Sequence, residues 1–172
     1  MRHLLSLLIA LACSLSACHE NVPKTIYHQS RVLPPQGWTR EDALSFEVTI
    51  QDSTQQDYDI AVEWRLEDNY VFSDINLLFE ADIDSTGKQD TLTVHTHVLD
   101  QHNVWKGKKG SSGLHQQRMF LKTIHFPQTG TYTLRIRQQM THDKPLKGIH
   151  DVGIIVSYPD DRHPDAGKQT IK

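Results

Sequence analysis

Cys18 is the residue whose surroundings in the sequence most clearly specify a chemical reaction. It ends the stretch Leu15-Ser16-Ala17-Cys18, which fits the bacterial lipobox, where small residues precede a cysteine that is acylated before the peptide ahead of it is removed. The apolar run over 4–15 is shorter than the roughly 20 residues that a membrane-spanning helix needs. We therefore predict a lipoprotein signal peptide over residues 1–17 and a palmitate-type lipid anchor on Cys18. A buried N-terminal helix ending in a free thiol agrees less well with the polar residues 19–21.

Histidines are the next candidates for chemistry. His95 and His97 are spaced to lie on one face of a strand, which suits zinc or copper, and His102 could add a third ligand from the following loop. The two strand histidines alternate with valines, so a polar outer face that happens to use histidine is the favoured interpretation. No cysteine remains for a thiolate site or a disulfide once Cys18 carries lipid. We predict no metal and no cofactor.

The loop over 100–113 combines Trp105, Lys106 and Lys108 with a third lysine and three glycines. Loops of this length are often functional or disordered. Backbone N–H groups freed by glycine could hold a phosphate, a carboxylate or an acidic sugar, and Trp105 could insert into a partner protein. The plain alternative is a mobile loop whose tryptophan folds back on the edge of the domain.

Nothing in the sequence matches a catalytic motif. Gly110-Ser111-Ser112-Gly113 is not a Gly-x-Ser-x-Gly nucleophile elbow, and the loop lacks the pattern of a phosphate-binding P-loop. Paired carboxylates lie in expected turns or in the tail, where charged runs are usually solvated. We predict that the protein is not an enzyme.

Three tripeptides fit the Asp-Ser/Thr pattern of periplasmic O-glycosylation in Bacteroidetes, with acceptors at Ser53, Ser85 and Thr91. Each falls in or beside an expected turn. Ordinary turn chemistry, in which Asp and Ser side chains bond their own backbone, is the favoured alternative.

Removal of residues 1–17 leaves 17 Lys and Arg against 21 Asp and Glu, a net charge of −4. A mildly acidic chain with interspersed charges has no general electrostatic reason to bind nucleic acid. His19 follows the cysteine where an Asp would favour inner-membrane retention, and no acid-rich tether follows that would favour the cell surface. We predict a lipid-anchored protein of the cell envelope, in the outer membrane and facing the periplasm.

Beyond the tether, apolar residues recur with a period of two, which indicates half-buried β-strands. Such strands are expected over 44–50, 58–66, 75–83, 92–98, 132–140 and 152–156, with weaker signals over 25–32 and over 114–126, where a bulge is possible. About eight antiparallel strands predict an all-β two-sheet sandwich, immunoglobulin-like or jelly-roll. The expected organisation is a tether over 18–24, a β-sandwich domain over 25–158 and a disordered tail over 159–172.

The order of motifs resembles the gliding motility lipoprotein H (GldH) family of Bacteroidetes. The similarity runs through the lipobox and the segments 27–28, 33–38, 50–53, 105–108, 126–132, 139–140 and 146–153. The most specific part is Gln139-Met140 followed by Gly148-Ile149-His150-Asp151-Val152-Gly153. One departure is Thr141, where the family usually has Arg.

The resemblance implies a non-enzymatic β-sandwich lipoprotein associated with gliding motility and, more loosely, with secretion of surface adhesins. No catalytic residue follows from it. The first hypothesis is a structural or assembly component that binds the bilayer through Cys18 and other envelope proteins of a motility or secretion complex. Its expected contact residues are Trp105, Lys106, Lys108, Met140 and Asp151. The second hypothesis is a glycan- or peptide-binding module that uses Trp105.

Overall fold

The computed structural model describes residues 24–52, 54, 57–83, 89–142 and 144–159. The predictions for the signal peptide, Cys18, the tether before Lys24, Ser53, Ser85 and the tail beyond Pro159 fall outside these residues. Among the described residues, no helix is long and apolar enough to cross a bilayer.

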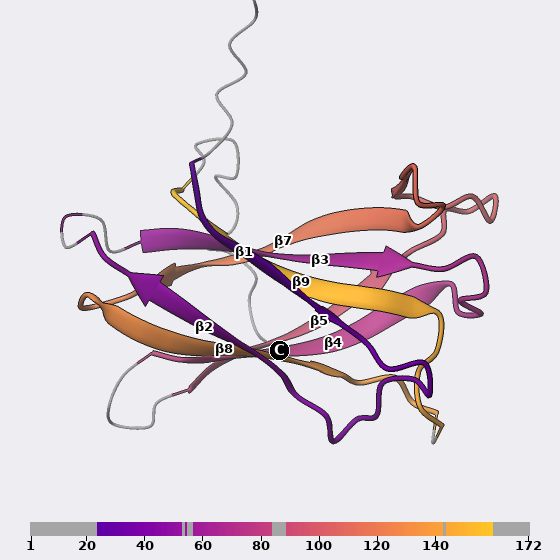
Figure 1. Ribbon diagram of the computed structural model, residues 1–172, viewed down its shortest axis with the longest axis horizontal. Coiled ribbons are helices and arrows are strands. Elements are labelled where there is room, and N and C mark those ends of the chain that lie inside the picture. Colours follow the sequence, from indigo (N-terminus) through magenta and orange to yellow (C-terminus); the bar gives the residue numbers. More distant parts are fainter. Residues whose placement is uncertain (1–23, 53, 55–56, 84–88, 143, 160–172) are drawn as a thin grey trace, which may run out of the picture.

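The described chain folds into nine β-strands, which confirms the all-β prediction (Figure 1). They are β1 Thr25–Val32, β2 Leu44–Ile50, β3 Asp57–Leu66, β4 Asp74–Asp82, β5 Gln89–His97, β6 Lys108–Lys109, β7 His115–His125, β8 Gly130–Gln138 and β9 Ile149–Ser157. Eight of these strands are long and correspond to the eight expected from the alternating pattern. The two-residue β6 lies inside the predicted loop over 100–113.

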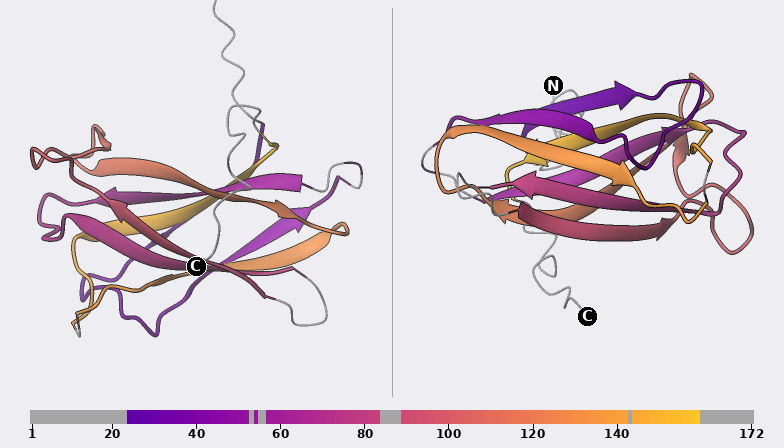
Figure 2. Two further views of the ribbon diagram at one scale, coloured as in Figure 1. Left: turned by 180° about the vertical axis from the view of Figure 1, so that it is seen from behind. Right: turned by 90° about the horizontal axis from the view of Figure 1, so that it is seen from below.

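Two antiparallel sheets pack face to face, one in the order β1-β9-β3-β7-β6 and the other in the order β2-β8-β4-β5 (Figures 1 and 2). Numbering the eight long strands from one to eight gives sheets of 1-8-3-6 and 2-7-4-5. This is the order of a jelly roll, which is built from two Greek keys. An immunoglobulin-like sandwich would instead keep its first two strands in one sheet, so the topology selects the jelly roll from the two predicted alternatives.

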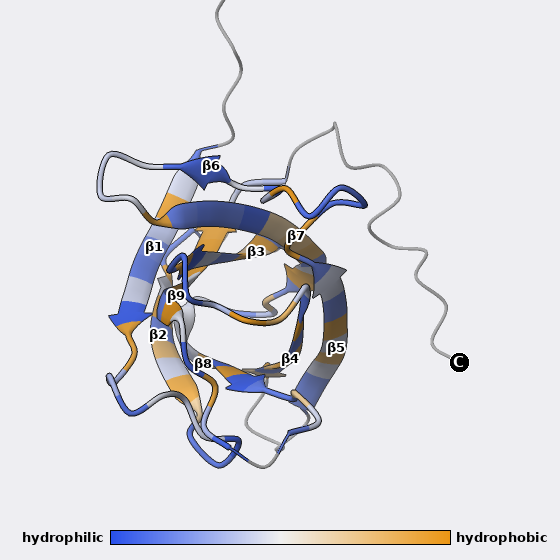
Figure 3. Cartoon of the chain, turned by 90° about the vertical axis from the view of Figure 1, so that its right-hand side faces the viewer, coloured by the Kyte–Doolittle hydropathy of each residue, from blue (hydrophilic) through white to orange (hydrophobic). Residues whose placement is uncertain are grey.

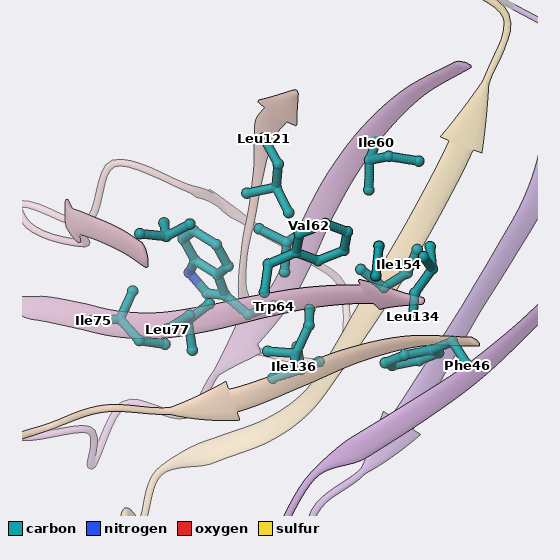
Figure 4. Close-up of a cluster of buried hydrophobic side chains, with 14 of the residues drawn as sticks. Phe46, Ile60, Val62, Trp64, Ile75, Leu77, Leu121, Leu134, Ile136 and Ile154 are labelled. Carbon is teal, nitrogen blue, oxygen red and sulfur yellow. The ribbon is translucent and has the colours of Figure 1, made fainter. Parts of the chain in front are cut away.

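The core lies between the sheets and is built from the alternating residues that the sequence indicated. Trp64, Phe46, Phe79 and Ile136 from four different strands are at most 1% exposed, and Figure 4 shows part of this cluster. β7 contains the bulge that was considered possible over 114–126. Its register against β3 shifts between Ile60 and Ala61. The extra residue of such a bulge sharpens the local twist of the sheet.

Loops gather at the two ends of the sandwich. The segments 33–43, 67–73, 98–114, 139–142 and 144–148 lie together at one end, which we call the loop end. Lys24, the ends of β2, β4 and β7, and Tyr158 lie at the other end, which we call the tether end. The strands run between the two ends, with the loop end on the right of Figure 1 and toward the viewer in Figure 3.

Candidate functional site: the interlocked loop end

The β1–β2 loop is fastened to the β8–β9 loop by a backbone bridge. The N–H of Trp38 donates to the carbonyl of Leu146 at 2.8 Å, and the N–H of Leu146 donates back at 2.8 Å. The Trp38 ring is fully buried, and its Nε1 donates to the carbonyl of Asp42 at 2.8 Å. Arg40 adds a hydrogen bond to the carbonyl of Met140. These contacts make two segments about a hundred residues apart into one structural unit.

The β3–β4 loop is held against the same β8–β9 loop at Gly148. The N–H of Glu67 donates to the carbonyl of Gly148 at 2.9 Å. Gly148 has a φ of +82°, and a Cβ added there would lie 2.7 Å from the Cα of Tyr70. Only glycine combines that backbone conformation with so close an approach. The Tyr70 hydroxyl donates to the carbonyl of Asp74 at 2.7 Å, and burial raises the pKa of this tyrosine.

The β5–β7 segment is joined to the β3–β4 loop through Asp68. The Asp68 carboxylate lies 2.7 Å from His115 Nε2 and 3.1 Å from Lys109 Nζ. The hydrogen bond to His115, followed by the one from Lys109, lowers the pKa of Asp68. A backbone bond from the N–H of Val98 to the carbonyl of Ser73, at 2.9 Å, fastens the start of the same segment. All four loops are therefore linked in one chain of contacts.

Trp105 is half-buried and packs on the edge of the sandwich. Its ring stacks on His115 with centroids 4.4 Å apart and planes 19° apart, and its backbone bridges to Leu99. This position corresponds to the alternative in which the tryptophan folds back on the domain. One face of the ring is thus already occupied.

The glycines of this loop place their backbones against the fold. The N–H of Gly110 donates to the carbonyl of Leu114 at 2.9 Å, and the N–H of Gly113 donates to the carbonyl of Gly110 at 3.0 Å. A Cβ added at Gly107 would lie 2.3 Å from the carbonyl oxygen of Gln116. The glycines therefore allow a tight hairpin between β6 and β7. The N–H groups of Gly110 and Gly113 are used within it and are not available to an anion. Lys106 and Lys108 are exposed.

Met140 and Asp151 lie inside the structure. Met140 is 4% exposed, its N–H donates to Gln138 Oε1 at 2.8 Å, and its sulfur accepts the N–H of Asn76 at 3.3 Å. Asp151 is 1% exposed and receives a two-pronged hydrogen bond from Arg65, whose Nε lies 2.8 Å from Oδ2. Hydrogen bonding to Asp151 raises the pKa of Arg65. Both residues therefore support the loop end from within.

The solvent-facing side of the loop end carries apolar tips and lysines. Val71 is 81% exposed at the tip of one loop, and Val104 is 58% exposed at the tip of another. An open hollow of about 670 Å³ is lined by residues that include His97, Asp100 and Lys106. The loop end therefore presents two exposed valines and an open hollow on loops that are hydrogen-bonded to one another.

The candidate metal ligands are arranged as surface side chains. His95 Nε2 lies 3.1 Å from Asp74 Oδ2, and the His95 and His97 rings meet edge to face at 5.4 Å. His102 lies beside Asp100 at 4.0 Å. Within the part of the chain that the structure describes, no three His, Cys, Asp or Glu side chains are grouped so as to hold a metal ion.

Sequence reasoning had not selected Trp38, Asp68, His115 or Gly148 as candidate site residues. Trp38 and Gly148 lie in segments that carry the family resemblance, so their residue types could have marked them as candidates for a structural role. Asp68 and His115 had no signal, because their pairing depends on two loops that meet only in the folded chain.

Comparisons with known proteins agree with this structure. A family model described as GldH lipoprotein matches residues 25–156, which is nearly the whole described chain. A gliding motility lipoprotein GldH homolog from Christiangramia forsetii is 25% identical over 130 residues, covering 72% of this chain and 78% of that protein.

Among solved structures, a fructofuranosidase variant from Schwanniomyces occidentalis, complexed with fructosylnystose, aligns with 80% of this chain at 7% identity and a TM-score of 0.36. The chain spans only 34% of that structure, and the likeness is too low to indicate a relationship. The family match, by contrast, covers the entire sandwich. The chain belongs to the GldH family of gliding motility lipoproteins, and as a lipoprotein it is held in the cell envelope by lipid.

Proposed function

We propose that this protein is a non-enzymatic docking component of gliding motility and adhesin-secretion machinery. Cys18 carries its lipid anchor in the outer membrane, on the periplasmic side, and the loop end contacts other envelope proteins. The observation that carries this proposal is the interlocking of four loops whose exposed tips include Val71 and Val104. A surface that is already ordered loses little conformational entropy on binding, which favours a specific protein contact.

The contact residues follow from exposure. Lys106 and Lys108 are exposed and follow Val104 closely in the segment 98–114. Trp105 supports that segment through its stack on His115. Met140 and Asp151 act by holding the loops in place, since both are buried. The observations favour docking over ligand binding by Trp105, because one face of this ring is covered.

Site-specific photo-crosslinking in cells tests the proposal. A photoreactive residue placed at Val71 or Val104 is expected to capture a component of the gliding or secretion machinery, identified by mass spectrometry. The matched control carries the photoreactive residue at Thr93 instead, which is exposed on the outer face of the four-stranded sheet. Equal capture at all three positions, or capture of no such component at the loop end, would contradict the proposal.

A complementation experiment adds a functional readout. Val71→Asp combined with Val104→Asp places charges at exposed positions and is expected to leave the thermal unfolding midpoint unchanged. Colony spreading and adhesin export are both expected to fall. Wild-type spreading by a stably expressed double variant would show that this surface is not used.

A further inference from the structure

A groove of about 620 Å³ opens at the tether end, between the start of β1 and the end of β2. This volume lies within the range of about 300–1,000 Å³ that is typical of small-molecule sites. The groove belongs to the edges of both sheets, at the end opposite the interlocked loops. Its ligand would therefore not compete with a partner at the loop end.

Three tyrosines from separate segments provide the aromatic part of the groove. Tyr27 comes from β1, Tyr58 from β3, and Tyr158 follows β9. The Tyr58 and Tyr158 rings pack with centroids 5.5 Å apart, and Tyr58 is only 1% exposed, so the floor of the groove is fixed by the core. Tyr27 and Tyr158 are half-buried and leave part of their surface open. The negative faces of such rings attract polarised C–H bonds.

Carboxylates and amides supply the polar part. Glu47, Gln51 and Asp52 line the groove, and Asp52 Oδ2 accepts the Tyr158 hydroxyl at 3.1 Å. Glu47 accepts the Thr133 hydroxyl at 3.1 Å, which orients this carboxylate. Asp52 is held on its other oxygen as well, because Oδ1 accepts the N–H and the hydroxyl of Thr54 at 2.9 and 2.6 Å. A carboxylate oxygen can accept more than one hydrogen bond, so the hydroxyls of a ligand can share these oriented acceptors.

Charge in the groove disfavours an anionic ligand. Two carboxylates line it, and the one ammonium among its lining residues, that of Lys24, lies 5.4 Å from the centre of the Tyr158 ring. This position gives Lys24 a cation–π contact. A phosphate or an acidic sugar would meet net negative charge here, whereas neutral hydroxyls would meet acceptors.

The edge of β1 at the groove is poorly suited to an added peptide strand. Its register against β9 shifts between Thr25 and Tyr27, which marks an irregularity at the residues that line the groove. Such an irregularity interrupts the regular row of backbone groups that strand addition requires. A ligand bound through side chains therefore fits better than an extended peptide.

We propose that the groove at the tether end binds a neutral oligosaccharide, with Tyr27 and Tyr158 against the sugar rings and Glu47, Gln51 and Asp52 on their hydroxyls. This ligand site is independent of the docking function of the loop end.

Titration calorimetry on the full lipidated chain in detergent tests this site. The probes are hexasaccharides of glucose, mannose and N-acetylglucosamine, with an oligogalacturonate as the charged comparison. Saturable binding of at least one neutral probe is expected, with the oligogalacturonate bound more weakly. Tyr27→Ala is expected to weaken binding at least about tenfold, which corresponds to about 1.4 kcal/mol. Tyr27→Phe keeps the ring and is expected to retain most of the affinity.

Two further variants distinguish loss of sugar binding from loss of stability and from loss of docking. Asp52→Asn keeps an acceptor for Tyr158 and is expected to weaken binding without lowering the unfolding midpoint. Val71→Asp, at the loop end, is expected to leave sugar binding unchanged whatever it does to docking. Absence of binding to all neutral probes, or affinity that is indifferent to both Tyr27→Ala and Asp52→Asn, would overturn the proposal. Displacement of the sugar by a second copy of the chain would also overturn it, because the groove would then be a protein interface.

Discussion

The two ends of this sandwich are fastened in different ways. At the loop end, backbone hydrogen bonds join one loop to another, as between Trp38 and Leu146. At the tether end, the turn between β7 and β8 closes on itself through the hydrogen bond from the Tyr132 hydroxyl to the carbonyl of Gln128 at 2.7 Å. Separate described segments meet there through fewer bonds, such as the one from the Tyr158 hydroxyl to Asp52. The first arrangement makes four loops depend on one another, while in the second the β7–β8 turn closes by itself.

This difference agrees with the separate roles that we propose for the two ends. A set of loops that share their hydrogen bonds opens only as a group, so its surface keeps one shape. At the tether end, the groove beside Tyr27 and Tyr158 opens between the edges of the two sheets. A fixed protein-binding surface and a small-molecule groove can thus coexist at opposite ends of the same strands.

Trp38→Ala is expected to have the largest effect, because it removes a fully buried ring from the bridge between two loops. Loss of a buried tryptophan typically costs about 3–5 kcal/mol. Urea unfolding of the purified domain measures this loss. The matched variant Trp105→Ala removes a half-buried ring and is expected to cost less; the reverse order would show that the β1–β2 loop is not central to the loop end.

Arg65→Met is expected to rank second. It leaves the Asp151 carboxylate buried without its guanidinium partner, and removing one partner of a fully buried ion pair typically costs about 3–5 kcal/mol. Because the Arg65 side chain is 37% exposed, we expect the lower end of this range. The double variant Arg65→Met with Asp151→Asn is expected to recover part of that free energy, as measured by a double-mutant cycle. No recovery would mean that the two side chains are not coupled.

Gly148→Ala and Gly113→Ala form a matched pair. Both glycines have φ near +80°, but a Cβ at Gly148 would meet the backbone of Tyr70, whereas a Cβ at Gly113 meets nothing within 4 Å. Gly113→Ala is expected to cost about 1 kcal/mol for the backbone conformation alone. Gly148→Ala is expected to cost about 2 kcal/mol or more. Equal losses in thermal unfolding would show that the contact between these loops is loose.

Acid is expected to weaken the five-stranded sheet between the two ends. Burial alone would raise the pKa of Glu63, but hydrogen bonds from Gln116 and His28 and the charge of Arg118 outweigh it and hold this pKa below 4.5. The carboxylate therefore contributes stability above pH 4.5, and that stability is lost as the pH falls through the lower folded pKa. Unfolding free energies measured from pH 7 to pH 3 should decline less in Glu63→Gln than in the wild-type protein.

Tyr132→Phe is expected to have the smallest effect. It removes the hydroxyl that closes the β7–β8 turn at the tether end, and a single exposed hydrogen bond typically contributes about 1 kcal/mol or less. Amide hydrogen exchange should quicken at Gln128 and remain unchanged at Trp38 and Leu146. Exchange that quickened at the loop end would contradict the independence of the two ends.

Strand periodicity was sufficient to predict the architecture, because apolar residues on one face of a strand specify a core without knowledge of its neighbours. The alternation around Phe46, Trp64 and Ile136 placed each of these side chains correctly in the core. The alternating pattern does not specify which strands pair with which. The choice of the jelly roll therefore required the structure.

The candidate site was predictable only in part, for the same reason. The positions of Trp105 and Met140 in their segments drew attention to two of the four loops that interlock. The burial of Asp151 was not predictable, because its position opposite an alternating apolar series normally means exposure. Its burial depends on Arg65 in the adjacent strand, and only the register between β3 and β9 brings the two together.

Strand length gives the loop end its height above the bilayer. A nine-residue strand such as β9 extends about 30 Å at roughly 3.3 Å per residue. With Cys18 acylated as proposed, a seven-residue connection to Lys24 adds at most about 25 Å. The valine tips would then operate several nanometres from the lipid headgroups, in reach of the periplasmic portions of neighbouring complexes, while the tyrosine groove would stay close to the leaflet.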